Sequence, residues 1–251
     1  MAQPSHREAV AGRHAVLEAL RSGREVHSVL VVHDAKDPEG VREAATVRGV
    51  TVRFLGSHEL TTLVGTAHHR GFGAFVAPMA DSSVRSLVEA ARAKGEEPFL
   101  VALDGVEDVG NLGAVARSAL LAGAHGLILP ERGNASVTEG ARKAASGAFS
   151  RLPVAAVSSL GSALAALRRD GVWVIGADAR GGKAPWSLDL AKACCIVLGS
   201  ENEGLSKATL EQLDARVCIP TPGGELSLNV SAAAAVLCFE RVRQVAARRG
   251  R

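Results

Sequence analysis

The chain has 251 residues, of which 47% are hydrophobic, and a formal net charge of +3 at pH 7. This composition is ordinary for a globular protein with a sizeable core, and the modest charge permits a nucleic-acid partner without requiring one. No apolar run approaches the roughly eighteen residues of a membrane span, and the first residues lack the apolar core of an export signal, so we expect a cytoplasmic protein without a membrane span.

The first third of the chain predicts a small αβ domain, because apolar residues at helical spacing alternate with β-branched runs. We expect helices at residues 10–20, 38–47 and 58–64. We expect strands at residues 26–32, 50–54 and 72–77. Polar and helix-breaking residues then mark a boundary, so we place the first domain at 1–79 and a linker with a helix (84–93) at 80–97.

The remaining residues, 98–251, predict a second and larger domain. Strands are expected at 99–103, 126–129, 152–157, 172–175, 193–198 and 217–219. Helices are expected at 112–122, 137–144, 160–168 and 226–247, with a short one after Ser206. Such regular alternation is typical of a mostly parallel sheet covered by helices on both faces.

The four cysteines do not suggest a metal site, since they form no C-x-x-C pair and no histidine stands at zinc-ligand spacing. We expect all of them to be reduced core residues: Cys194, Cys195, Cys218 and Cys238.

The turn at residues 199–206 follows a predicted buried strand and precedes a helix, a position where α/β sheets bind small ligands. It nearly matches a phosphate-binding P-loop, but Leu205 replaces the lysine, and Glu201 and Glu203 would repel a triphosphate. A nucleotide kinase or phosphatase is therefore disfavoured. The turn suits a ligand that is cationic or presents hydroxyls and amines, and an ordinary turn with solvated acids is the alternative.

Two other loops hold polar residues at helix starts. In residues 104–113, Asn111 is a plausible N-cap, and Arg117 follows on an apolar helix, where we expect it to point into a cleft or an interface. In residues 219–231, one of Ser227, Asn229 and Ser231 is expected to cap the last helix, which leaves the other two without an explanation.

These three loops together resemble motifs one, two and three of the SpoU/TrmH family, within the SPOUT superfamily of RNA methyltransferases. The matching residues are Asn111 with Arg117, then Gly199-x-Glu201-x-x-Gly204, then Ile219-Pro220 with Ser227-Leu228-Asn229-Val230-Ser231. The first domain is similar, more weakly, to the family's small substrate-binding domain, which looks like ribosomal protein L30. Its similarity lies in residues 12–16 and in His69-Arg70-Gly71.

The resemblance implies a fold and a cofactor. The second domain would contain a deep trefoil knot that binds S-adenosyl-L-methionine. By similarity, the cofactor-binding positions are Leu198, Gly199, Gly204, Ile219, Pro220, Leu228 and Ser231. No metal is implied, and family sites form across a homodimer interface.

The implied reaction is methyl transfer to a ribose 2′-hydroxyl. Arg117 would orient the ribose and its phosphate and stabilise developing oxyanion charge, since a guanidinium hardly loses its proton in proteins. Asn111 and Glu201 would fix Arg117 and the loops, while Ser227 and Asn229 would shape the cleft or contact the ribose.

The implied substrate is RNA, and two-domain members typically modify a guanosine of 23S ribosomal RNA. Basic residues are the candidates for phosphate contacts: Arg13, Arg70, Arg142 and Lys143. Val109-Gly110 stands where many close relatives have Pro-His, so a tRNA or antibiotic-resistance rRNA methyltransferase remains an alternative. A non-catalytic RNA-binding factor in ribosome assembly is a third interpretation.

Overall fold

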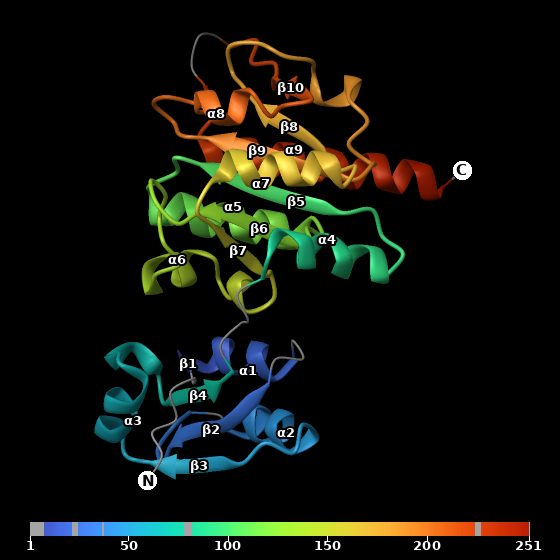
Figure 1. Cartoon of the computed structure of the whole chain (residues 1–251). Coiled ribbons are helices and arrows are strands. Elements are labelled where there is room, and N and C mark those ends of the chain that lie inside the picture. Colours follow the sequence, from blue (N-terminus) through green and yellow to red (C-terminus); the bar gives the residue numbers. More distant parts are fainter. Residues whose placement is uncertain (1–7, 22–24, 37, 78–81, 224–226, 251) are drawn as a thin grey trace. The chain divides into compact units, whose positions relative to one another are not determined.

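The computed structural model, shown in Figure 1, describes residues 8–21, 25–36, 38–77, 82–223 and 227–250. The chain divides into two compact units, Met1–Ala80 and Asp81–Arg251. Among the described residues, no helix is both long and apolar enough to cross a membrane.

The first unit is a four-stranded sheet with helices on both faces. Its strands stand in the order β1 (Glu8–Ala11), β4 (Phe72–Val76), β2 (Val26–Val32) and β3 (Val52–Leu55). Only β2 and β3 pair in parallel, and the other pairs are antiparallel. The helices are α1 (Arg13–Arg21), α2 (Glu39–Val47) and α3 (Ser57–Val64), with a 3-10 turn η1 (Ala67–His69). Val29 and Val31 pack with α1 and α2, whereas Leu30 and Val32 pack with α3 on the opposite face.

The predicted first helix is wrong at its start. Val10 belongs to β1, where it pairs with Ala74, and the helix begins only at Arg13. Gly12 separates the two elements with a φ of 99°, a conformation that glycine adopts without steric cost.

The second unit is a six-stranded, fully parallel sheet, which confirms the predicted architecture. The strands stand in the order β10 (Ala215–Val217), β8 (Trp173–Ala177), β9 (Cys194–Gly199), β5 (Phe99–Asp104), β6 (Gly126–Pro130) and β7 (Val154–Val157). The helices are α4 (Val84–Ala93), α5 (Val109–Leu121), α6 (Glu139–Ala144), α7 (Leu160–Arg169), α8 (Lys207–Leu210) and α9 (Val230–Arg249). Two 3-10 turns complete the unit, η2 (Ala148–Ser150) and η3 (Pro185–Ser187).

Both faces of this sheet are covered (Figure 1). Apolar residues of α5, α6 and α9 pack on one face, and those of α4 and α7 pack on the other. The strands are accordingly buried almost throughout, as expected of a parallel sheet. The knot implied by the resemblance stays a prediction.

Helix α4 occupies the residues predicted for a linker helix, but it is part of the second unit. Leu87 and Val88 are buried there against Leu100 and Leu164. Leu87 also leaves no room for a side chain at Gly126, where an added Cβ would lie 2.5 Å from its Cδ1. The amphipathic face of α4 therefore stabilises the sheet that it precedes.

All four cysteines are free thiols, and three of them lie in the core as predicted. Cys194 and Cys195 lie on β9 and Cys238 on α9, and all three are fully buried. Cys218 is only half-buried, so its predicted core position is wrong. The strand β10 ends one residue before it, and the chain there leaves the sheet toward the surface.

Candidate active site

The predicted site residues gather at the carboxyl ends of neighbouring strands in the second unit. Strands β8, β9 and β10 are adjacent in the sheet, and the chain enters an irregular loop after each of them. The loop after β5 meets the same edge, because β5 pairs with β9 up to Asp104 and Gly199. This is the edge at which open α/β sheets bind ligands.

Asn111, Glu201 and Asn229 form one hydrogen-bonded cluster, although they come from three separate loops. Oε1 of Glu201 accepts hydrogen bonds from Nδ2 of Asn111 at 2.9 Å and from Nδ2 of Asn229 at 2.6 Å. Nδ2 of Asn229 also donates to Oδ1 of Asn111 at 3.1 Å. Because an ionised carboxylate only accepts hydrogen bonds, the two amide groups of the asparagines are oriented by Glu201.

Helix caps set the orientation of both asparagines. Asp108, and not Asn111 as predicted, caps α5, and its Oδ1 accepts from the backbone N of Asn111 at 2.7 Å. The side chain of Asn111 is thus available to Glu201. Of the three residues predicted as possible caps of α9, Asn229 is the one that caps it. Its Oδ1 accepts from the backbone N of Ser231 at 2.8 Å and from Oγ of Ser231 at 2.6 Å.

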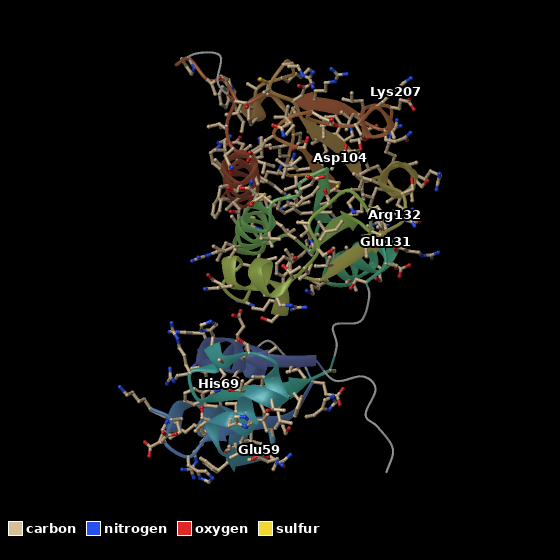
Figure 2. The ribbon with its side chains drawn as sticks, turned by 90° about the vertical axis from the view of Figure 1, so that its left-hand side faces the viewer. Glu59, His69, Asp104, Glu131, Arg132 and Lys207 are labelled. Carbon is tan, nitrogen blue, oxygen red and sulfur yellow. The ribbon has the colours of Figure 1, made fainter. Side chains whose placement is uncertain are left out.

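The turn after β9 is closed on itself and fixed to the loop after β5. Ser200 and Gly204 exchange two backbone hydrogen bonds of 3.1 and 3.0 Å. A Cβ at Gly199 would lie 2.3 Å from the carbonyl carbon of Gly204, so only glycine fits there. The carboxylate of Asp104, labelled in Figure 2, accepts from the backbone N of Ser206 at 2.7 Å.

A cavity of about 480 Å³ opens beside this turn. Apolar side chains form much of its wall: Ala177, Leu198, Val217, Ile219, Leu228, Val230 and Ala233. Polar and charged residues complete it: Asp178, Arg180, Ser200, Glu201, Asn202, Thr221 and Ser227. Its volume and mixed lining are typical of a small-molecule site.

Most of the residues predicted to bind a cofactor line this cavity. Leu198, Gly199, Gly204, Ile219 and Leu228 are in its wall, as is Ser227 from the predicted catalytic set. Pro220 and Ser231 are adjacent in sequence to wall residues, but they are not among the described residues that form the wall. Residues 224–226, within the loop predicted at 219–231, lie outside the described residues.

Arg117 is not among the described residues that line the cavity. It is exposed on α5, and its Nη1 donates to Oγ of Ser146 at 3.3 Å. Ser146 has a φ of 48°, in the left-handed region that a residue with a side chain seldom adopts. Helices α5 and α6 approach closely because Gly113 has no side chain, since a Cβ there would lie 2.5 Å from Cβ of Ala144.

The candidate RNA-binding residues lie in both units. On α6, Arg142 is half-buried and Lys143 is exposed. In the first unit, Arg13 is half-buried with its Nη2 near Gly40, and Arg70 is exposed with a φ of 50°.

His69, labelled in Figure 2, supports the loop that carries Arg70. It is buried, its Nδ1 accepts from the backbone N of Gly71 at 3.0 Å, and its Nε2 lies 3.0 Å from Oγ1 of Thr61. These bonds assign the proton to Nε2. In the described part of the chain, no three His, Cys, Asp or Glu side chains are grouped so as to hold a metal ion.

Sequence reasoning did not select Asp178 and Arg180, which the fold places in the cavity wall, or Arg216, which contacts Asp178. Oδ1 of Asp178 accepts from the backbone N of Arg180 at 2.9 Å, and its Oδ2 lies 3.5 Å from Nη1 of Arg216. The sequence signal that could have indicated Asp178 is its position directly after β8, the strand that pairs with β9.

Comparison with protein families decides the identity of this fold. Residues 98–239 match the SpoU rRNA Methylase family, and residues 9–82 match the family described as RNA 2′-O ribose methyltransferase substrate binding. The chain belongs to the SpoU rRNA methylase family. The predicted resemblance is thereby confirmed for both domains.

Individual SpoU relatives cover almost the whole chain. It is 36% identical over 241 residues to the 23S rRNA (guanosine-2′-O-)-methyltransferase RlmB of Xanthomonas campestris, covering 94% of this chain and 96% of that one. It is 37% identical over 240 residues to an uncharacterized tRNA/rRNA methyltransferase of Mycobacterium sp. strain KMS. That alignment covers 94% of this chain and 76% of the relative. The crystal structure of the SpoU methyltransferase AviRb from Streptomyces viridochromogenes, in complex with AdoMet, superposes on this chain with a TM-score of 0.77 at 25% identity. The superposition covers 97% of this chain and 92% of AviRb.

Proposed function

We propose that this protein transfers a methyl group from S-adenosyl-L-methionine to a ribose 2′-hydroxyl in RNA, and that its substrate is a guanosine of 23S ribosomal RNA. The observation that carries the proposal is the joining of all three SpoU motifs at Glu201, beside a cavity of suitable size. The guanosine assignment rests on the RlmB relatives, which align over almost their full length. An rRNA substrate also favours action in the cytoplasm.

The cavity fits S-adenosyl-L-methionine by its shape and chemistry. Gly199 lets the turn after β9 close against the backbone of Gly204 and so shapes one side of the cavity, and the apolar wall suits a flat adenine ring. The carboxylates of Asp178 and Glu201 favour a ligand that carries positive charge, which the sulfonium and amino groups supply. When bound, this cofactor supplies a methyl group activated by its positive sulfur.

The protein's contribution to the reaction is positioning and charge. Glu201 and the two asparagines hold the loops that form the cavity wall, and Ser227 presents a hydroxyl to the cavity. The 2′-hydroxyl of ribose is a weak nucleophile, so negative charge must develop on its oxygen as its proton leaves. The Arg117 guanidinium stabilises that charge and orients the neighbouring phosphate through two parallel hydrogen bonds.

Arg117 reaches the cofactor in the cavity of a second copy of the chain. Its exposed position outside the cavity of its own chain supports this arrangement. A further support is an exposed apolar face on α9, because Val236, Phe239 and Val242 recur at three-residue spacing with 44%, 47% and 36% of their surface exposed. Such a face favours association, and α9 packs beside α5, which carries Arg117.

The experiment that tests the function is incubation of the purified protein with labelled S-adenosyl-L-methionine and either 23S rRNA or bulk tRNA. We expect label only in the rRNA, at one guanosine that mass spectrometry identifies as 2′-O-methylated. Label confined to tRNA would assign the alternative substrate. A protein that binds rRNA but shows no cofactor binding by calorimetry would be an assembly factor instead.

A further inference from the structure

Arg180 lies at the mouth of the cavity, on the loop that follows β8. Its Nη2 donates to the carbonyl oxygen of Glu203 at 3.0 Å, and a Cβ at Gly204 would lie 3.0 Å from the same nitrogen. Its Nε lies 3.7 Å from Oδ1 of Asp178, while 76% of the side chain remains exposed. The guanidinium is thus held by one hydrogen bond, while most of its side chain is exposed and belongs to the cavity wall.

The charges around the cavity complement those of the methyl donor. Among the described wall residues, Asp178 and Glu201 are acidic and Arg180 is the basic one. S-adenosyl-L-methionine carries the opposite set, with positive sulfonium and amino groups and one negative α-carboxylate. Arg180 is therefore the group in the wall with the charge that a carboxylate requires.

We propose that Arg180 binds the α-carboxylate of the methionyl part of S-adenosyl-L-methionine. A guanidinium has five N–H donors in a fixed plane, and the bond to Glu203 uses one of them. That bond fixes the guanidinium beside the turn after β9, and further donors are left for a ligand in the cavity that Arg180 lines. This assignment rests on the proposed function and adds a specific contact to it.

The test compares two ligands that differ in the amino-acid part. S-adenosylhomocysteine retains the carboxylate, whereas methylthioadenosine lacks the whole amino-acid part, and both contain a neutral thioether. With Arg180→Gln we expect the dissociation constant of S-adenosylhomocysteine to rise about ten-fold, since a charge-assisted contact is lost. The dissociation constant of methylthioadenosine should change less than about two-fold, because it never makes this contact. Equal weakening of both ligands would overturn the proposal and show that Arg180 acts only by holding the turn.

Arg216→Gln is the matched control. Arg216 also pairs with Asp178, but it is not among the described residues of the cavity wall. This variant removes the same charge near the same acid, and we expect it to leave the ratio of the two dissociation constants unchanged. If both variants alter the ratio, the effect comes from the loss of positive charge near Asp178 and not from a contact made by Arg180.

Binding by the unaltered protein separates this inference from the proposed function. If the wild-type protein binds neither nucleoside in calorimetry, the proposed function fails and the inference fails with it. If it binds both, and Arg180→Gln leaves their ratio unchanged, only the assignment of Arg180 is overturned.

Discussion

Nδ2 of Asn229 lies 2.6 Å from Oε1 of Glu201, so the residue that caps α9 is bonded directly to the turn after β9. The same carboxylate oxygen holds Asn111 at the start of α5. One side chain therefore connects the two helices on one face of the sheet with the loop that forms the cavity.

Replacing Glu201 with alanine should damage both the stability of the turn and the reaction. Two hydrogen bonds are lost, and at about 1 kcal/mol each they should lower the free energy of unfolding by about 2 kcal/mol. Methyl transfer should also fall, because the two asparagines lose the carboxylate that joins them to the turn after β9. Glu203→Ala is the control, since the contacts described for Glu203 involve its backbone. A Glu201→Ala protein as stable and active as Glu203→Ala would contradict this role.

Replacing Arg117 with alanine should lower methyl transfer to a small residual rate while cofactor binding stays within a few-fold. Loss of one group that stabilises developing charge lowers turnover by about 10² to 10³. The cofactor contact is spared because Arg117 is not in the described cavity wall. Single-turnover kinetics and calorimetry measure the two quantities separately, and unchanged turnover would remove Arg117 from the mechanism.

A mixture of the Arg117→Ala and Glu201→Ala proteins tests whether two copies share each site. If Arg117 acts on the cavity of the partner, a mixed dimer has one site with both changes and one with neither. Activity should then reappear when the inactive proteins are mixed and allowed to exchange subunits. Activity that stays absent in verified mixed dimers would place each complete site within one chain.

Ser146→Gly should separate backbone strain from support of Arg117. Glycine relieves the positive φ of 48°, so the free energy of unfolding should rise by about 1 kcal/mol. Loss of Oγ removes the partner of Arg117, and turnover should fall although the protein is more stable. Ser146→Ala loses the same oxygen without relief of strain. Full activity in both variants would show that the contact has no role in catalysis.

Cys218 should be the one thiol that reacts quickly in the native protein. Burial raises the pKa of the Cys194 thiol to about 11 and that of Cys238 to about 12, and it raises the pKa of Cys195 as well. Cys218 is half-buried between Val217 and Ile219, which both line the cavity. Saturating S-adenosylhomocysteine should therefore slow its labelling at pH 8. Cys218→Ser should eliminate the fast phase, and a fast phase that persists would identify a different thiol.

The pair of Glu96 and His125 should contribute stability that is lost in acid. Nδ1 of His125 accepts from the backbone N of Phe99, so Nε2 carries the proton and donates to Glu96 at 2.8 Å. This hydrogen bond holds the pKa of the Glu96 carboxyl below its ordinary value. The stabilisation is then complete above the unfolded pKa of about 4.3 and disappears as the pH falls through the folded pKa.

Denaturant unfolding of Glu96→Gln across pH 3 to 7 measures this contribution. The wild-type protein should be more stable near neutral pH, and the difference should shrink toward pH 3. Glu97→Gln is a neighbouring control, because Arg241 binds the backbone oxygen of Glu97. A difference that is independent of pH would show that the carboxylate charge is not involved.

Much of the fold follows from local patterns in the sequence. Strand β2 and helix α4 have the predicted limits, since each combines a clear period with breakers at its ends. Val10 was misplaced because its helical spacing continues that of α1, while its actual partner Ala74 is 64 positions away. The cap of α5 was misplaced because Asp108 and Asn111 are both good capping residues, and only the structure shows which one bonds to the helix.

The candidate site was predictable where a motif marks it and not elsewhere. Asn111, Glu201 and Asn229 were selected from sequence and are joined in the structure. Arg180 was not selected, because a charged loop residue carries no periodic signal and its contact with Glu203 depends on the order of β8 and β9 in the sheet.

The hydrogen bond between Asn111 and Asn229 spans 118 positions, and this distance has a consequence for biosynthesis. A nascent chain leaving the ribosome exposes Asn111 early and Glu201 later, but the cluster cannot close until translation has passed residue 229. Premature termination after the end of β10 and before residue 229 yields polypeptides with all six strands of the parallel sheet and without the assembled motifs. Catalytic competence is thus acquired late in synthesis, after most strands are available to pair.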